Sequence, residues 1–82
     1  MSDDAFVVGS IKKGKNEEVQ IAIKEYKGVR YCDIRLWFQG AGGEYKPTAK
    51  GVTVGLKSLG KLSELVTEAI ELAKDRGWTS AE

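Results

Sequence analysis

The sequence lacks histidine entirely and has one cysteine, Cys32, and one proline, Pro47, among its 82 residues. Without an imidazole there is no histidine general base, no Ser/His or Cys/His pair, and no zinc site of thiolates and imidazoles. A single thiol cannot build a disulfide framework. No apolar run approaches the roughly 18 residues that a membrane-spanning helix needs. The composition therefore argues against an enzyme and against a membrane protein, and we expect no cofactor and no metal.

The remaining reactive side chains favour structural roles. Asp33 lies two residues before Arg35, so the two side chains share a strand face and an ion pair is expected. Cys32 belongs to an apolar row, which is typical of an inert buried thiol. The glycine-rich segment Gly40–Gly43 is not followed by Lys-Ser/Thr and opens no helix, so it fits a hairpin tip better than a phosphate-binding loop.

Apolar and polar residues alternate with period two through much of residues 5–54, as in β-strands. The alternation predicts strands at Ala5–Ile11, Val19–Lys24, Val29–Gln39, Glu44–Lys46 and Val52–Val54. Lys27-Gly28 predicts a tight hairpin, and Pro47, which has no N–H, is expected to end the pairing of the segment before it. We divide the chain into residues 1–16, which are flexible or form a short extra strand, a binding domain at 17–77, and a tail at 78–82.

The longest predicted strand, Val29–Gln39, separates its side chains into two rows. The apolar row contains Cys32, Ile34, Leu36 and Phe38, and the polar-aromatic row contains Tyr31, Asp33, Arg35 and Trp37. Because successive side chains of a strand point to opposite faces, we expect the apolar row to face the core and Trp37 to face outward.

The period changes to that of a helix over residues 58–76, with Gly77 as its C-terminal stop. One face carries Leu59, Leu62, Val66, Ala69, Ile70 and Ala73, widened by Leu65 and Leu72. Strands followed by a helix predict an α+β domain, a twisted antiparallel sheet with one helix covering a face. Such a core is thin, so part of Leu62, Leu65, Leu72 or Trp78 is expected to remain exposed in a monomer and to be buried in a symmetric dimer.

Charge is distributed unevenly. Residues 5–56 contain nine basic and five acidic residues, a net charge of +4, whereas residues 57–82 contain four basic and five acidic ones. Five aromatic residues lie in the central third of the chain, interleaved with the basic residues: Tyr26, Tyr31, Trp37, Phe38 and Tyr45. Cations mixed with exposed rings are what single-stranded nucleic acid requires, because phosphates need charge and unpaired bases stack. The alternative interpretation is that the rings are half-buried sheet residues and the lysines a solvated surface.

The segment DIRLWFQGAGGEYKPTAKGVTV, residues 33–54, resembles the C-terminal domain of the transcriptional coactivator positive cofactor 4 and its bacterial and phage relatives. The shared pattern is D-I-R, an aromatic pair, a glycine-containing turn, then G-E-x-K-P-x-x-K-G and a β-branched strand. IAIKEYKG, residues 21–28, is similar to the first hairpin of that family. The resemblance extends over about residues 17–77.

The resemblance implies a four-stranded antiparallel sheet followed by one C-terminal amphipathic helix, assembled as a homodimer that binds single-stranded DNA with little sequence preference. By the motif, the nucleic-acid-binding positions fall on Lys24, Tyr26, Lys27, Arg35, Trp37, Phe38, Lys46 and Lys50, with Lys15 and Arg30 as substitutes for two further basic positions.

Two departures from the family pattern affect these residues. The hairpin turn is one residue shorter, so the basic position after the glycine is occupied by Val29, with Arg30 next to it. The motif places the stacking ring on Phe38, whereas strand alternation turns Trp37 outward; a β-bulge near Trp37 would reconcile the two. The long N-terminal regulatory extension of the eukaryotic coactivator is also missing, which favours the compact prokaryotic or phage form.

The sequence thus predicts a non-enzymatic homodimer that binds single-stranded DNA or a melted duplex, acting in transcription or in DNA replication, recombination or repair. The expected location is the cytoplasm, with the nucleoid, or the nucleus in a eukaryote. The alternative is a protein-interaction module that docks a transcription or replication protein through its helix.

Overall fold

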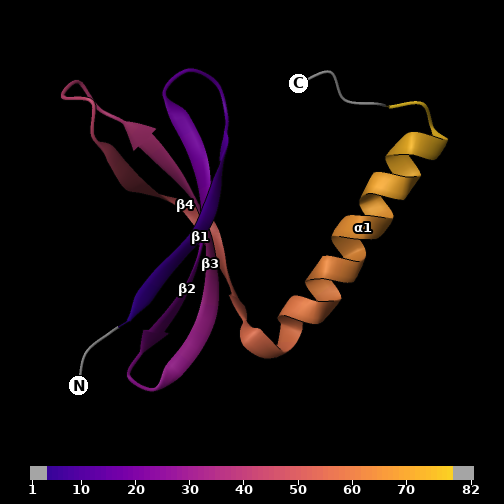
Figure 1. The fold of residues 1–82 in the computed structure, drawn as a ribbon, viewed down its shortest axis with the longest axis horizontal. Helices are drawn as coiled ribbons and strands as arrows, with labels where there is room; N and C mark the ends of the chain where they lie inside the picture. Colours follow the sequence, from indigo (N-terminus) through magenta and orange to yellow (C-terminus); the bar gives the residue numbers. More distant parts are fainter. Residues whose placement is uncertain (1–3, 79–82) are drawn as a thin grey trace.

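A computed structural model describes residues 4–78 of the chain, and it contains one antiparallel sheet followed by one helix (Figure 1). The strands are β1 (Ala5–Lys12), β2 (Glu17–Tyr26), β3 (Val29–Gln39) and β4 (Tyr45–Gly55), and they lie side by side in chain order. A short 3₁₀ turn, η1 (Leu56–Ser58), leads into α1 (Leu59–Asp75). The predicted α+β class, the four-stranded antiparallel sheet and the single C-terminal helix are confirmed.

The turns follow the backbone preferences of their residues. Lys27 and Gly28 both have positive φ, 51° and 82°, as the two central residues of a type I′ hairpin do. At the tip between β3 and β4 the Gly43 N–H donates to the Gly40 carbonyl at 3.0 Å, so this glycine-rich segment is a turn. The β1 strand occupies much of residues 1–16, where flexibility or a short extra strand is expected; residues 1–3 lie outside the described part of the chain.

The prediction for β4 was wrong in one respect. Two separate short strands are expected around Pro47, but β4 runs continuously from Tyr45 to Gly55. Pro47 is tolerated because β4 is an edge strand, where a missing N–H removes no bond that the sheet needs. The register with β3 shifts between Arg35 and Trp37, and the extra residues of this bulge lie on β4. Pairing between β3 and β2 stays regular there, so Trp37 and Phe38 remain on opposite faces.

Helix α1 ends as its sequence predicts. Gly77 has φ 75°, the Trp78 N–H donates to the Ala73 carbonyl at 2.8 Å, and the Gly77 N–H donates to the Lys74 carbonyl at 3.0 Å. This pair of bonds is the Schellman motif, and glycine supplies the left-handed conformation that the motif requires. Of the tail predicted at 78–82, residues 79–82 lie outside the described part of the chain.

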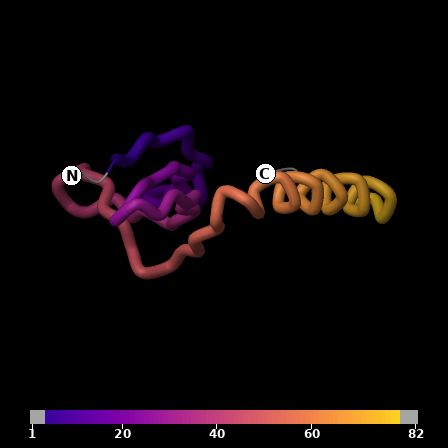
Figure 2. Tube along the Cα trace, turned by 90° about the horizontal axis from the view of Figure 1, so that it is seen from below, coloured from indigo at the N-terminus to yellow at the C-terminus, as the bar shows by residue number. Residues whose placement is uncertain are grey.

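The prediction that the helix covers one face of the sheet was wrong for the single chain. Helix α1 extends away from the strands, and Figure 2 shows the same separation from a second direction. No large side chain among residues 4–78 is fully buried, and only Ala22, Cys32 and Asp33 are classed as buried at all. The radius of gyration is 15.1 Å, whereas a compact chain of this length has about 12 Å. The physical reason is that the helix leaves the sheet edge through η1 without turning back over the strands.

Candidate functional site

Strand pairing assigns the side chains to two unlike faces of the sheet. Directly opposed residues share a face, and β2 residues Gln20 and Ile21 oppose Arg35 and Ile34 of β3. We call the polar face the one that carries Lys12, Glu18, Gln20, Lys24, Tyr26, Tyr31, Asp33, Arg35, Trp37 and Tyr45. The apolar face carries Phe6, Ile11, Val19, Ile21, Ile23, Ile34, Leu36, Phe38, Val52 and Val54. The two rows predicted for β3 are therefore confirmed.

An ion cluster occupies the centre of the polar face. The Arg35 guanidinium donates from Nη2 and Nε to the two carboxylate oxygens of Asp33, at 2.9 and 3.2 Å. The Lys24 ammonium lies 3.5 Å from the same carboxylate. The hydrogen bonds from Arg35, followed by the charge of Lys24, hold the pKa of the Asp33 carboxyl below its usual value although burial opposes this. One buried acid is thus matched by two bases, which leaves the cluster with net positive charge.

Arg35, on β3, also forms a side-chain hydrogen bond to the neighbouring strand β4. Its Nη1 donates to the Thr48 carbonyl at 3.0 Å, and the Thr48 hydroxyl donates to the Leu36 carbonyl at 2.8 Å. These bonds hold the β4 bulge in place. Guanidinium has five N–H donors and three are used here, so two remain for another acceptor. Opposite Arg35 stands Gly51, where a Cβ would lie 2.8 Å from the Ile34 carbonyl oxygen, so close approach of the strands requires glycine.

The hairpin between β2 and β3 presents a ring and two cations. Tyr26 is 52% exposed, and the Lys27 ammonium lies 5.3 Å from the centroid of its ring. Arg30 approaches Glu25 at 3.7 Å, and its side chain is otherwise in solvent. By register Arg30 and Glu25 lie on the apolar side of the sheet, whereas Tyr26 belongs to the polar face. The hairpin therefore offers an accessible aromatic surface next to positive charge.

Trp37 and Phe38, adjacent on β3, lie on the predicted faces, but their burial differs from the prediction. Trp37 lies on the polar face as predicted, but its side chain is partly buried. Phe38 lies on the apolar face, yet it is 48% exposed because no element within residues 4–78 covers this end of that face. The predicted inward position of Phe38 is thus correct for the face and wrong for its burial.

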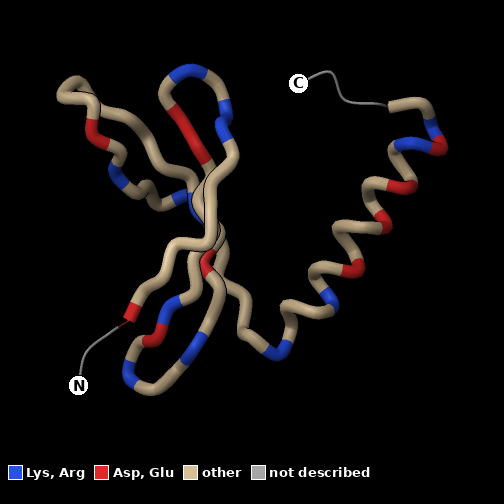
Figure 3. The backbone as a smooth tube through the Cα atoms, in the orientation of Figure 1, with Lys and Arg blue, Asp and Glu red and all other residues tan. Residues whose placement is uncertain are grey.

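The remaining predicted residues do not gather on a single face. Lys15 lies in the β1–β2 turn, Lys46 opposes Phe38 on the apolar side, and Lys50 lies in the β4 bulge. The structure brings together Lys24, Tyr26, Arg35 and Trp37 on the polar face, with Lys27 at its end. Figure 3 shows basic residues along the strands and turns of the sheet, whereas acidic residues recur along the helix.

Sequence reasoning missed two residues of the polar face, Lys12 and Tyr45. The Lys12 ammonium donates to the Tyr45 hydroxyl at 2.9 Å and lies 5.3 Å from the centroid of the tyrosine ring. This hydrogen bond raises the pKa of Lys12. The two residues are 33 positions apart and lie on the two edge strands, so no local pattern in the sequence could have paired them.

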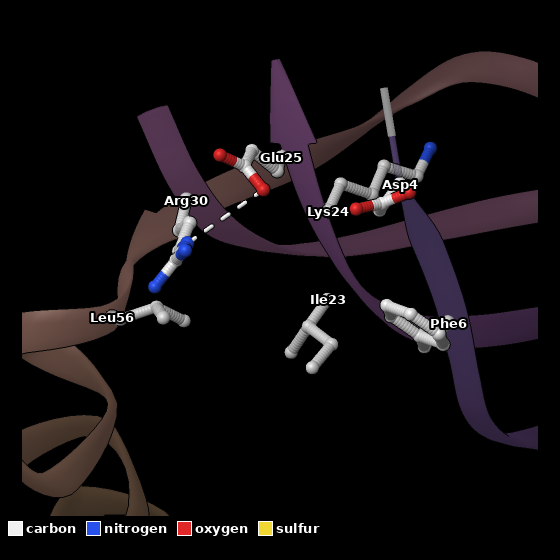
Figure 4. A pocket seen from close by; sticks show the side chains of 7 residues that line it. All are labelled: Asp4, Phe6, Ile23, Lys24, Glu25, Arg30 and Leu56. Carbon is white, nitrogen blue, oxygen red and sulfur yellow. Dashed lines mark ion pairs between the residues drawn. The ribbon is translucent and has the colours of Figure 1, made fainter. Parts of the chain in front are cut away.

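The apolar face contains a hollow of about 360 Å³ near the hairpin end of the sheet (Figure 4). Phe6, Ile23 and Leu56 form its apolar part, and the Glu25–Arg30 ion pair lies on its rim. Within residues 4–78, no three acidic or cysteine side chains are grouped so that they could hold a metal ion. The described helices include none that is long and apolar enough to cross a membrane.

Comparison with known proteins gives one family and several similar folds. The family model described as Transcriptional Coactivator p15 (PC4) matches residues 11–65. A PC4 homologue from Burkholderia pseudomallei K96243, in its orthorhombic crystal form, is 23% identical with a TM-score of 0.75, over 84% of this chain and 93% of that one. Its tetragonal form gives 23% and 0.73, over 80% and 97% of the two chains.

A third similar structure comes from bacteriophage T5. This homologue of the eukaryotic coactivator PC4, implicated in recombination-dependent DNA replication, is 21% identical with a TM-score of 0.55. The similarity covers 94% of this chain and 83% of the phage chain. The search of curated proteins gave no match. At these identities the solved structures establish a shared fold, and the family model covers more than half of the sequence.

Proposed function

The chain belongs to the transcriptional coactivator p15 (PC4) family, and from this premise we propose that it is a non-enzymatic homodimer that binds single-stranded DNA or the melted part of a duplex. Weak sequence preference is expected, because phosphate contacts and base stacking read no base edges. The role lies in transcription or in DNA replication, recombination or repair; the description of the phage T5 homologue supports the second group. The observation that carries the proposal is a polar sheet face that combines cations, Lys24 and Arg35, with the exposed ring of Tyr26 and the partly buried ring of Trp37.

The chemistry of the polar face suits an unpaired strand better than a duplex. Tyr26 offers an exposed ring to bases and Trp37 a partly buried one, and Lys24, Lys27 and the two unused donors of Arg35 offer charge to phosphates. A duplex keeps its bases stacked inside, so rings gain little from it, and duplex readers commonly place a helix in the major groove. Here the helix is unsuited to that role.

Helix α1 carries an acidic stripe opposite its apolar stripe. Glu64, Glu68, Glu71 and Asp75 recur at intervals of three and four residues, which places them on one side of a helix. Phosphates would be repelled from that side. The charge pattern thus supports nucleic-acid binding on the sheet and leaves the helix for another task.

That task is dimer formation through the apolar surfaces. Leu65, Val66, Ile70 and Leu72 of α1 are about half exposed, and so are several residues of the apolar sheet face. The helix makes no substantial contact with its own strands, so one chain carries two apolar surfaces that lack partners among residues 4–78. A twofold dimer can satisfy both at once, because each helix can cover the apolar face of the other chain. The hollow lined by Phe6, Ile23 and Leu56 offers a place for apolar helix side chains.

A titration of labelled oligonucleotides tests DNA binding. Fluorescence anisotropy with a thymidine 20-mer and with a 20-base-pair duplex should show clearly tighter binding of the single strand. Contact with four or five phosphates predicts a slope of about −3 for log affinity against log salt concentration. Lys27→Met should reduce the magnitude of this slope by about 0.7, whereas Lys74→Met on the helix should leave it unchanged. Equal affinity for both DNA forms would contradict the proposal.

The two rings of β3 give a second, independent measurement. Trp37→Ala is expected to weaken single-strand binding by roughly fivefold or more through the loss of one stacking surface. Phe38→Ala should weaken binding less and should lower the stability of the dimer, because Phe38 lies on the apolar face. Circular dichroism of each variant shows whether it folds. The reverse order of binding losses would move the stacking ring to Phe38, as the family motif implies.

A second candidate function rests on the exposed apolar residues of the helix and on Trp78, which follows it. Leu65, Leu72 and Trp78 are 48%, 55% and 71% exposed, which also fits a module that docks a transcription or replication protein. Analytical ultracentrifugation separates the two: a dimer leaves no free stripe for such a partner, whereas a monomer with weak DNA affinity would favour docking.

A further inference from the structure

Lys12 and Tyr45 contact each other across the sheet, and neither is among the residues proposed above to bind DNA. Lys12 ends β1 and Tyr45 begins β4, the two outer strands, and strands spaced ~4.8 Å apart put these edges roughly 14 Å from each other. The side chains nevertheless meet, with 2.9 Å between the ammonium nitrogen and the phenol oxygen. They reach across the polar face at the end where Lys12, Glu18 and Trp37 form one cross-strand row.

From this geometry we infer that Lys12 and Tyr45 form an additional nucleotide subsite, which is closed in the free protein by the bond between them. The inference rests on the proposed function. When a single strand occupies the polar face, a phosphate replaces the Tyr45 hydroxyl as the acceptor for Lys12, and the freed ring stacks on the adjacent base. No covalent bond changes, and one hydrogen bond is exchanged for another.

Exchanging the phenol for a phosphate is favourable for Lys12, and stacking on a base is favourable for the Tyr45 ring. An ammonium binds a phosphate anion more strongly than a neutral phenol, since a charged acceptor makes the shorter and stronger hydrogen bond. The Lys12 ammonium lies 2.9 Å from the Tyr45 hydroxyl oxygen and 5.3 Å from the ring centroid, so it lies at the hydroxyl end of the ring and does not cover the ring face. Stacking of a base on such a ring changes affinity by about 5- to 150-fold.

Neighbouring groups limit where the phosphate can sit. Glu18 opposes Lys12 in the sheet and accepts a hydrogen bond from the Gln20 amide at 2.7 Å. Its carboxylate would repel an anion placed over β2. The phosphate is therefore expected over β1, next to Lys12, and the base over β4, next to Tyr45. The subsite therefore gives the bound strand a defined crossing from one sheet edge to the other.

Three variants of the full chain test the subsite by anisotropy with the labelled thymidine 20-mer. Tyr45→Phe keeps the ring and removes the hydroxyl, so its affinity should equal or exceed that of the wild type by up to a few-fold. Tyr45→Ala should bind at least about fivefold more weakly. Lys12→Met should also bind more weakly, with the salt slope reduced by about 0.7. Thermal unfolding of each variant identifies losses that come from misfolding, and Tyr45→Phe serves as the matched folded control.

The outcomes separate the subsite from the proposed function. Tyr45→Ala binding as tightly as the wild type, or Tyr45→Phe losing as much affinity as Tyr45→Ala, would overturn the subsite while Trp37→Ala and Lys27→Met still report on the polar face. A wild-type chain with no preference for single strands, together with unchanged binding of Trp37→Ala and Lys27→Met, would overturn both. The exchange is supported if the affinity for the single strand falls in the order Tyr45→Phe, wild type, Lys12→Met, Tyr45→Ala. Of these variants, only Lys12→Met should show a reduced salt dependence.

Discussion

The two faces of the sheet differ in whether a single chain supplies partners for their side chains. On the polar face the buried carboxylate of Asp33 has both Arg35 and Lys24 as partners, and Arg35 reaches on to β4. On the apolar face Phe6, Val52 and Phe38 are about half exposed or more, and no described element covers them. The charged groups of the polar face have partners within the chain because an unpaired buried charge is costly. The exposed apolar surface can instead be buried by a second molecule.

The largest expected effect comes from placing a charge on the apolar helix stripe. Ile70→Asp would force a carboxylate into the proposed dimer interface, where burying an unpaired charge costs several kcal/mol. We expect dissociation to a poorly folded monomer at micromolar concentrations in sedimentation velocity. Thr67→Asp adds the same charge outside the apolar stripe of α1 and should leave the dimer intact. A dimeric Ile70→Asp protein would show that the stripe is not the interface.

The polar face can be weakened separately through its buried acid. Asp33→Asn removes the charge that pairs with Arg35 and Lys24, and hydrogen bonds to charged groups are worth about 1.5–3 kcal/mol each. We expect the free energy of unfolding at pH 7 to fall by roughly 2 kcal/mol, with dimer formation retained. Chemical denaturation of the wild type and the variant measures this loss.

The same carboxylate predicts a pH dependence. Because the folded-state pKa of Asp33 is lowered, its contribution to stability is fully present above the unfolded pKa, about 3.9, and disappears as the pH falls through the lower folded value. Urea unfolding of the wild type should therefore show a loss of stability below about pH 4. Asp33→Asn should lack this component, and an identical acid profile in both proteins would contradict the assignment.

A smaller effect is expected where the strands approach most closely. Gly51→Ala would place a methyl group 2.8 Å from the Ile34 carbonyl oxygen and 3.0 Å from Arg35 Cα, so backbone has to move. Overpacking of this kind costs about 1–3 kcal/mol. Gly55→Ala is the matched control on the same strand, because its Cβ would meet nothing within 4 Å. Thermal unfolding should show a lower melting temperature for Gly51→Ala alone.

The regular parts of the molecule could be predicted from sequence because local periodicity determines them. The alternation of Cys32, Ile34 and Leu36 with polar neighbours gave the two faces of β3, and Gly77 gave the end of α1. Pro47 misled the prediction because its effect depends on strand order: β4 is an edge, and edge position is a property of the whole sheet.

The candidate site was predicted in part for the same reason. Residues that repeat along one strand, such as Arg35 and Trp37, were placed on the polar face from alternation alone. Contacts between strands depend on register and curvature, so the meeting of Lys12 with Tyr45 could not be foreseen. The position of the helix was predicted wrongly because an amphipathic pattern indicates that a face is buried and carries no information about which chain buries it.

The irregular stretch of β4 has a consequence for contact between sheets of different molecules. Pro47 offers no N–H outward, and the bulge at Thr48–Lys50 interrupts the even spacing of backbone groups along that border. Lys46 and Lys50 add charge to the same strand. These features disfavour the addition of a further strand along the first half of β4, and so oppose growth into fibre-like aggregates at that part of the border.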